Sequence, residues 1–141
     1  MSKEDYRFYQ VMPKGFHIDG FTQIPRVLIR HFSTLDISPG EFCVLLQLIS
    51  YYFDRGDQPK LSHKRIAESI GRAERQVVRY LRSLEKKGII ERGDMQEVMG
   101  GKVRSYKLET GLNKMAKDLY RHNRNKEKMQ NTSKEIQATE E

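Results

Sequence analysis

The sequence lacks most of the residues that enzymes and metal proteins need. It contains a single cysteine, Cys43, so no disulfide can form within the chain. It has no glycine-rich loop followed by Lys-Ser or Lys-Thr, and no acidic cluster typical of a nuclease or polymerase. The four histidines are scattered and none has a metal-ligand spacing to the cysteine: His17, His31, His63 and His122. We therefore predict a protein that has no catalytic residues and requires no metal or other cofactor.

Long apolar runs are also missing. The longest, residues 42–49, is interrupted by Gln47 and is too short to cross a bilayer. The first six residues are polar and do not begin a signal peptide. With 141 residues, of which 37% are hydrophobic, the chain can bury one modest core. We expect a cytoplasmic protein with a single domain and no membrane partner.

The apolar pattern divides the chain into three parts. In residues 1–24 the apolar residues alternate loosely between glycines, which predicts an N-terminal extended arm lying against the core. Residues 25–120 carry helical apolar spacings and one hairpin, which predicts the folded domain. After Tyr120 the apolar spacing stops, so residues 121–141 are predicted to be a disordered polar tail.

Two helices are predicted to open the domain. The first runs from Pro25 to about Ser33, with Val27, Leu28 and Phe32 inward. Ser38 and Glu41 form the capping-box pattern at the start of the second. The second helix has an apolar stripe at helical spacing, made of Phe42, Leu45, Leu46, Ile49 and Phe53. Because Cys43 lies within this apolar helix, we interpret it as a buried structural thiol and not as a nucleophile.

Residues 61–90 have the pattern of a helix-turn-helix. Ser62 is the predicted cap of a short helix, and Gly71 closes that helix with a turn. Its inward residues are Ile66, Ala67 and Ile70, and those of the next helix, residues 73–87, are Val77, Leu81 and Leu84. A small residue at the helix crossing, glycine in the turn and a β-branched residue packing back are typical of the motif. Arg72 departs from the pattern, since an apolar residue is commoner there.

The positive charge of the chain is confined to this region. Residues 60–108 contain 13 Lys/Arg and 6 Asp/Glu, whereas the remaining residues contain 13 of each, so the whole net charge of +7 lies in one third of the chain. Such a local excess is typical of a surface that binds a polyanion. The alternative is an ordinary surface rich in lysine and arginine.

The predicted second helix of the motif carries polar residues on its outer face. We expect Arg75, Gln76 and Arg79 to contact base edges in a DNA major groove, where arginine pairs with guanine and glutamine with adenine. The residues expected to contact the DNA backbone are Ser62, Lys64, Arg72 and Arg82. The alternative is that some of these arginines only pair with Glu74 or Glu85 on the same helix.

A hairpin wing and a last helix are predicted to follow. Ile89–Arg92 and Val103–Leu108 are the predicted strands, joined at Gly100-Gly101. Lys102 and Arg104 lie just past this turn and are expected to contact the DNA backbone. The alternative is a hairpin that only closes the core, and Met95, Val98 and Met99 favour packing or a protein contact. The last helix begins after Gly111, with Leu112, Met115, Ala116 and Leu119 on one face.

Residues 60–71 and 77–90, together with the upstream segments 20–25 and 35–42, carry a resemblance to a known family. They resemble the winged-helix N-terminal domains of plasmid and phage replication-initiation proteins, including DnaD-like replisome organisers, over about residues 20–110. The segment Leu84–Ile90 is also similar to transcription regulators of the MarR and GntR types. The resemblance implies a mainly α fold with a small β wing, the winged helix-turn-helix.

Two functions of different classes fit these observations. The first is a sequence-specific binder of double-stranded DNA that acts in plasmid or phage replication, maintenance, transfer or transcription control. A homodimer is expected because one recognition helix covers few base pairs, with the first helix or Leu112–Leu119 as its interface. The second is a protein-interaction module, a replisome or relaxosome scaffold with weak nonspecific DNA affinity, whose partners would be replication or transfer proteins.

Overall fold

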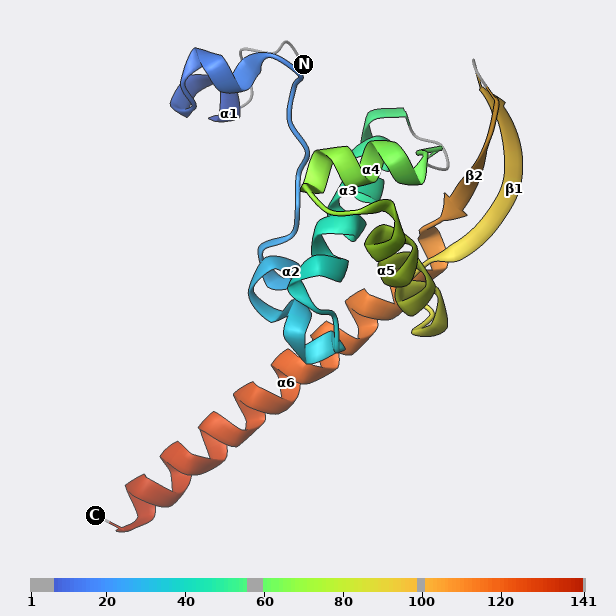
Figure 1. Ribbon diagram of the computed structural model, residues 1–141. Coiled ribbons are helices and arrows are strands. Elements are labelled where there is room, and N and C mark those ends of the chain that lie inside the picture. Colours follow the sequence, from blue (N-terminus) through green and yellow to red (C-terminus); the bar gives the residue numbers. More distant parts are fainter. Residues whose placement is uncertain (1–6, 56–59, 99–100, 141) are drawn as a thin grey trace.

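A computed structural model describes residues 7–55, 60–98 and 101–140 as a helical body with one two-stranded sheet (Figure 1). The helices before the sheet are α1 (Arg7–Val11), η2 (Lys14–His17), α2 (Arg26–His31), η3 (Phe32–Leu35), α3 (Pro39–Arg55), α4 (His63–Ile70) and α5 (Glu74–Lys86). Strands β1 (Glu91–Val98) and β2 (Gly101–Lys107) precede α6 (Glu109–Glu140). The predicted fold class, mainly α with a small β wing, is confirmed. No helix of these described ranges is both long and apolar enough to span a bilayer.

Helix α3 lies at the centre of the core, where α4 and α5 pack against it (Figure 1). Phe42, Leu45 and Ile49 are buried as predicted, and Val44 and Leu48, which lie outside the predicted stripe, are also fully buried. A helix covered on more than one side needs a wider apolar arc than a surface helix does. The side chain of Phe53 lies outside the described residues.

The interpretation of Cys43 as a buried thiol is wrong, because the structure places this side chain on the exposed side of α3. The predicted Leu46 is only half-buried, beside that exposed side. Leu46 lies three residues after Cys43 and therefore next to it on the helix surface. The sequence placed Cys43 inside because its neighbours are apolar, but the buried arc of α3 does not extend to it.

Helix α2 and the adjoining η3 lie against the core, and η3 contacts α3 through an aromatic stack. Leu28 is buried, and Phe32 stacks on Phe42 with ring centroids 4.4 Å apart. Val27 was predicted to point inward, but 40% of it is exposed. Because α2 is only six residues long and lies on the surface, it turns a single narrow face to the core.

The N-terminal segment differs from the predicted extended arm. Residues 7–17 form α1 and η2, and Figure 1 shows them apart from the helical body, joined to it by a single extended strand of chain. Phe8 stacks on Phe21 with ring centroids 4.7 Å apart, and Tyr9 packs edge-on against both Phe21 and His17. These aromatic side chains pack against one another within the segment. Their loose alternation in the sequence therefore reflects this local packing and not strands that lie against the core.

Helix α6 is much longer than predicted. Met115 and Leu119 are buried in the core as expected, whereas Ala116 is exposed, which corrects its predicted place on the inward face. The prediction of a disordered tail after residue 120 is wrong for the described part, because α6 continues to Glu140 and projects from the body (Figure 1). Residues 112–140 contain no glycine or proline and many good helix formers, so the helix continues without tertiary support.

The start of α3 is joined to the end of α5 by one ion pair. The predicted capping box forms, with Ser38 N donating to Glu41 Oε1 and Glu41 N donating to Ser38 Oγ, both at 3.2 Å. Lys87 Nζ donates to both carboxylate oxygens of Glu41 at 3.0 Å and also to the Asp36 carbonyl. Lys114 of α6 donates to the Lys87 carbonyl at 2.9 Å. The C-terminal end of α5 is therefore fixed to both α3 and α6.

The same interactions set the charge state of Glu41. Burial raises the pKa of this carboxyl group, but hydrogen bonds from Lys87, Ser83 and Ser38 outweigh burial and hold it below its ordinary value of 4.5. Glu41 is consequently ionised in the folded protein at neutral pH. A carboxyl group whose pKa is lowered by folding stabilises the native state above its unfolded pKa.

Replacing Glu41 by glutamine is expected to lower the free energy of unfolding at pH 7 by about 2 kcal/mol, since Lys87 loses its charged hydrogen-bond partner. The difference from the wild type should shrink as the pH falls below 4.5 through the lowered pKa, because the wild-type carboxylate is then protonated too. Urea unfolding at pH 7 and below pH 4 measures both quantities. Glu68→Gln, on the exposed side of α4, is the control and should change neither. A pH-independent difference for Glu41→Gln would contradict the assignment.

Candidate nucleic-acid interface

Helices α4 and α5 form the predicted helix-turn-helix. Ser62 caps α4 by accepting a hydrogen bond from Arg65 N at 3.1 Å, and Gly71 closes it in a left-handed conformation with φ of 69°. Ile66 and Ala67 of α4 are buried against Val77, which is fully buried in α5. Arg72 is exposed in the turn, so a charged residue is tolerated at this position.

The outer face of α5 presents three arginines in a row. Arg75, Arg79 and Arg82 follow one another at i, i+4 and i+7 and are all exposed, whereas Gln76 is half-buried. The opposite face is buried through Val77, Leu81 and Leu84, as predicted. The core contacts therefore fix which way the arginines point.

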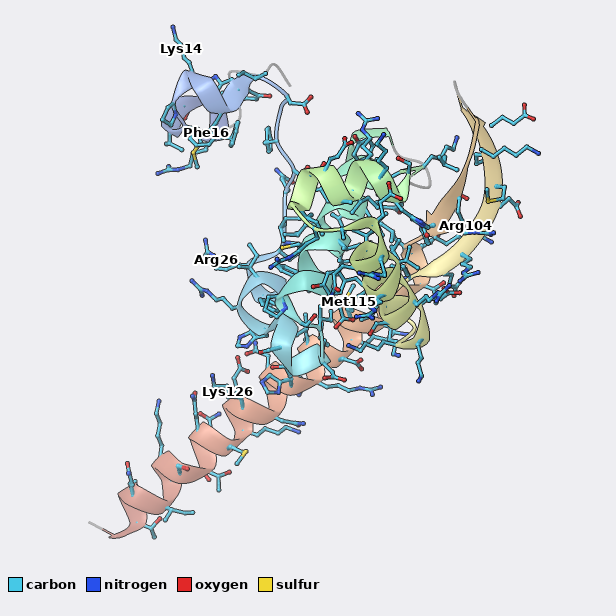
Figure 2. The ribbon with its side chains drawn as sticks, in the orientation of Figure 1. Lys14, Phe16, Arg26, Arg104, Met115 and Lys126 are labelled. Carbon is cyan, nitrogen blue, oxygen red and sulfur yellow. The ribbon has the colours of Figure 1, made fainter. Side chains whose placement is uncertain are left out.

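Apart from Arg72 in the turn, the other predicted contact residues lie on two elements, α4 with its N-cap and strand β2. Lys64 is exposed in the first turn of α4, and Lys102 is exposed near the tip of β2. Ser62 is half-buried, and its Oγ is already the acceptor of the α4 cap. Arg104 is half-buried on β2, where Figure 2 shows it on the side of the wing that faces the helical body. The structure thus places the predicted residues around the exposed face of α5.

The wing begins later in the sequence than predicted and contains a bulge. Ile89 and Ile90 are buried and precede β1, which starts at Glu91. The register is irregular between Arg92 and Met95, and Ser105 Oγ there donates to the Asp94 carbonyl at 2.9 Å. Met95 is 48% exposed, consistent with a surface contact. The predicted turn residue Gly100 and Met99 lie outside the described residues, as does the side chain of Val98.

A cleft of about 120 Å³ separates α5 from the wing. Arg92 and Tyr106 face each other across the two strands and so share one face of the hairpin. The cleft is lined by His63, Val78, Leu81, Arg82, Glu85, Arg92, Arg104 and Tyr106. His63, Arg92 and Tyr106 also belong to this surface, although the sequence pattern did not indicate it. The pairing register of the two strands brings these residues together. Because of the bulge, that register cannot be predicted from the alternation of apolar and polar residues along the sequence.

Hydrogen bonds hold most of the polar groups of the cleft. Arg92 Nε donates to Glu85 Oε2 at 2.9 Å, and Arg104 donates to the Gly93 carbonyl at 3.2 Å. The ring of His63 lies 3.3 Å from the Tyr106 hydroxyl oxygen. Within the described ranges, Glu85 pairs with Arg92 of the wing, and no ion pair joins an α5 arginine to Glu74 or Glu85, so the alternative of pairing within the helix is not observed there.

The positive charge of the cleft affects its titratable groups. Burial lowers the pKa of His63 below its ordinary value of 6.5, Glu74 partly opposes this, and the charges of Arg104 and Arg92 add to it. Burial likewise raises the pKa of Tyr106 above 10.0, against the effect of the two arginines. At neutral pH His63 is therefore uncharged and Tyr106 keeps its proton. Within the described ranges no three His, Cys, Asp or Glu side chains gather as a metal site would require.

Comparisons with known proteins identify the family and the fold. The sequence model of the family described as the DnaD N-terminal domain matches residues 24–130. The crystal structure of the N-terminal domain of DnaD from Geobacillus kaustophilus is similar with a TM-score of 0.57 and 20% identity, over 93% of this chain and 98% of that one. A MepR–DNA complex from S. aureus has a TM-score of 0.46 and 19% identity, over 82% and 90% of the two chains. None of the curated proteins matches the sequence.

An NMR titration should show the His63 ring changing protonation below pH 6.5, in accordance with its lowered pKa. Because the unfolded chain binds this proton at higher pH, the contribution of His63 to stability is complete above 6.5 and is lost as the pH falls through the folded-state value. The His63→Gln variant identifies the resonance and is the control for the stability measurement. A His63 titration at or above 6.5 would show that the cleft is more hydrated than its geometry indicates.

Proposed function

Since the chain belongs to the family of DnaD N-terminal domains, we propose that it binds double-stranded DNA with sequence specificity, as a winged-helix protein without enzymatic activity. The process it serves is plasmid or phage replication, maintenance, transfer or transcription control, in the cytoplasm and without a cofactor. Replication or transfer proteins are its candidate partners.

The observation that carries this proposal is the exposed arginine face of α5 next to a basic wing. The buried side of α5 turns Arg75, Arg79 and Arg82 outward, and an exposed helix gains little from three like charges on one side. A helix lying in a major groove gains both phosphate and base contacts. The excess charge of residues 60–108 supplies the long-range attraction to a polyanion.

The proposed roles follow the direction of each side chain. Arg75, Gln76 and Arg79, in the first half of α5, contact base edges. Contacts to phosphates, which position the protein without reading sequence, are made by Ser62, Lys64, Arg72, Arg82, Lys102 and Arg104.

A second candidate, a protein-interaction module, is favoured by apolar residues that the body does not cover. Phe16 is 65% exposed and Ile18 88% exposed on the segment that Figures 1 and 2 show apart from the body. Met129 and Ile136 are 72% and 54% exposed on the projecting part of α6. Exposed apolar residues grouped on protruding segments are typical of protein contacts. As a scaffold, the protein would bind DNA only weakly and without sequence preference.

Charge reversal on α5 separates the two functions. Arg75→Glu and Arg79→Glu are expected to abolish detectable binding to a duplex from the gene's own neighbourhood while the fold is retained, since even neutral loss of one base-reading arginine costs about 1–3 kcal/mol. Fluorescence anisotropy across a salt series, against a scrambled duplex, measures affinity and specificity together. Wild-type affinity should fall with roughly the 0.9 power of salt for each phosphate contacted.

Arg26→Glu is the matched control, because it reverses an exposed arginine on α2, away from the wing (Figure 2). It should keep nearly wild-type affinity for the specific duplex. Equal, weak binding of the wild type to both duplexes, unchanged by reversal on α5, would exclude the first function and support the scaffold.

A homodimer is proposed, with an interface on α2. Of the two surfaces suggested by the sequence, residues 112–119 are occupied, since Met115 and Leu119 are buried in the chain's own core. Helix α2 instead exposes Val27 and Ile29, at 40% and 49%. Sedimentation equilibrium should show a dimer for the wild type and a monomer for the double variant Val27→Glu, Ile29→Glu. A dimer that persists in this variant but is lost in Met129→Glu, Ile136→Glu would move the interface to α6.

A further inference from the structure

The cleft between α5 and the wing collects positive charge from three separate elements. Arg82 comes from α5, Arg92 from β1 and Arg104 from β2, and they line one small cavity together with His63 and Tyr106. Glu85 is the one carboxylate in its lining. Three positive charges against one negative charge leave a surplus of two in this cleft.

The structure holds these groups in place before any ligand arrives. Arg104 is fixed by the Gly93 carbonyl, which the β1 bulge turns toward it, and a carbonyl does not neutralise its charge. Arg92 is fixed by Glu85, whose side chain is 34% exposed at the cleft. Tyr106 is held against His63 with its hydroxyl in the cleft. Like charges that line one cleft repel one another, and a bound anion would offset this repulsion.

We infer that this cleft is a binding site for one phosphate group, held by Arg82, Arg92 and Arg104. Guanidinium groups match phosphate oxygens with paired hydrogen bonds, and the protonated Tyr106 hydroxyl is a further donor. A volume of about 120 Å³ is that of about four water molecules, which suits a phosphate with its four oxygens.

Glu85 competes with a phosphate for this site. It occupies Arg92 in the empty cleft through the 2.9 Å ion pair, so a phosphate competes with a carboxylate for one of the three arginines. Removing that carboxylate frees Arg92 and raises the surplus charge. Glu85→Gln is therefore expected to bind phosphate several-fold more tightly, in contrast to the loss expected for the arginine variants.

The phosphate can come from two sources. The first source is a DNA backbone phosphate, which reaches the cleft when α5 lies in the major groove. This source rests on the proposed function. A free phosphate or the phosphate of a small molecule is the other source, and it does not require DNA binding at all. The closing experiment therefore uses inorganic phosphate and a random-sequence duplex separately, because contacts to phosphate are independent of base sequence.

His63 reports on occupancy. It faces Tyr106 and Arg104 of β2, Arg92 of β1 and Arg82, Glu85 and Glu74 of α5. A bound phosphate offsets the arginine charges that lower the pKa of His63, so its NMR titration should move to higher pH when inorganic phosphate is added. Phosphate that bound elsewhere on the basic surface would leave this ring unchanged.

The test compares the full chain with three variants. Arg104→Gln, which keeps a donor for the Gly93 carbonyl, and Arg92→Gln are each expected to weaken inorganic phosphate binding about tenfold, the usual loss for one charged hydrogen bond. Arg26→Gln on α2 is the matched control and should bind phosphate as the wild type does. Arg104→Gln should also reduce the salt dependence of duplex binding by about one phosphate. Amide spectra confirm that each variant keeps the fold.

Each outcome decides between the site and the function on which one of its sources rests. Loss of both phosphate and duplex binding in Arg104→Gln supports the cleft with DNA as the source. Loss of phosphate binding alone supports the cleft with a small phosphorylated ligand. If the wild type binds phosphate at His63 but no duplex, the proposed function fails and the cleft stands. If the duplex binds while neither probe moves the His63 ring, the cleft is overturned and the proposed function stands.

Discussion

The ion pair between Glu41 and Lys87 is the interaction on which the position of α5 depends. It joins the first turn of α3, the central core helix, to the residue that ends α5, and Lys114 ties the same residue to α6. Glu41 also completes the cap of α3, so one carboxylate orders both helix ends. Because α5 is fixed at this end and packed through Val77 and Leu81 along its length, it cannot rotate about its axis. Its arginines are therefore presented to solvent in one fixed direction.

Because the position of α5 is fixed, the wing always lies beside the same surface. The bulge after Arg92 places Arg92 and Arg104 on the face of the hairpin that meets α5, and the cleft between them follows from that register. Arg75 and Arg79 are exposed on α5, whereas Arg92 and Arg104 at the cleft are hydrogen-bonded to Glu85 and to the Gly93 carbonyl. The first pair can change rotamer, whereas the second pair is held in one geometry. In the proposed function, the first pair contacts bases and the second pair contacts phosphates.

Much of this arrangement could be predicted from the sequence, because it rests on local patterns. The capping box at Ser38 and Glu41, the turn at Gly71 and the inward residues of α5 each depend on spacings within one or two turns of helix, and all three are confirmed. Predictions that depend on what covers a surface were wrong: Cys43 is exposed, and the aromatic residues of the N-terminal segment pack on one another. The cleft could not be predicted, since it depends on a bulge and on the contact between His63 and Tyr106, 43 positions apart. The assignments of single residues to bases or phosphates remain predictions.

The projecting part of α6 has a mechanical consequence. Twenty residues of helix extend about 30 Å at the usual rise per residue, roughly the diameter of a small domain. The root of this helix is held in the core by Met115 and Leu119 and is hydrogen-bonded through Lys114 to the residue that ends α5. A tilt of only about 5° at the root would move the far end by roughly 3 Å, a displacement comparable to half a helical turn. The packing at the root therefore sets where the far end of α6 lies, well outside the folded body.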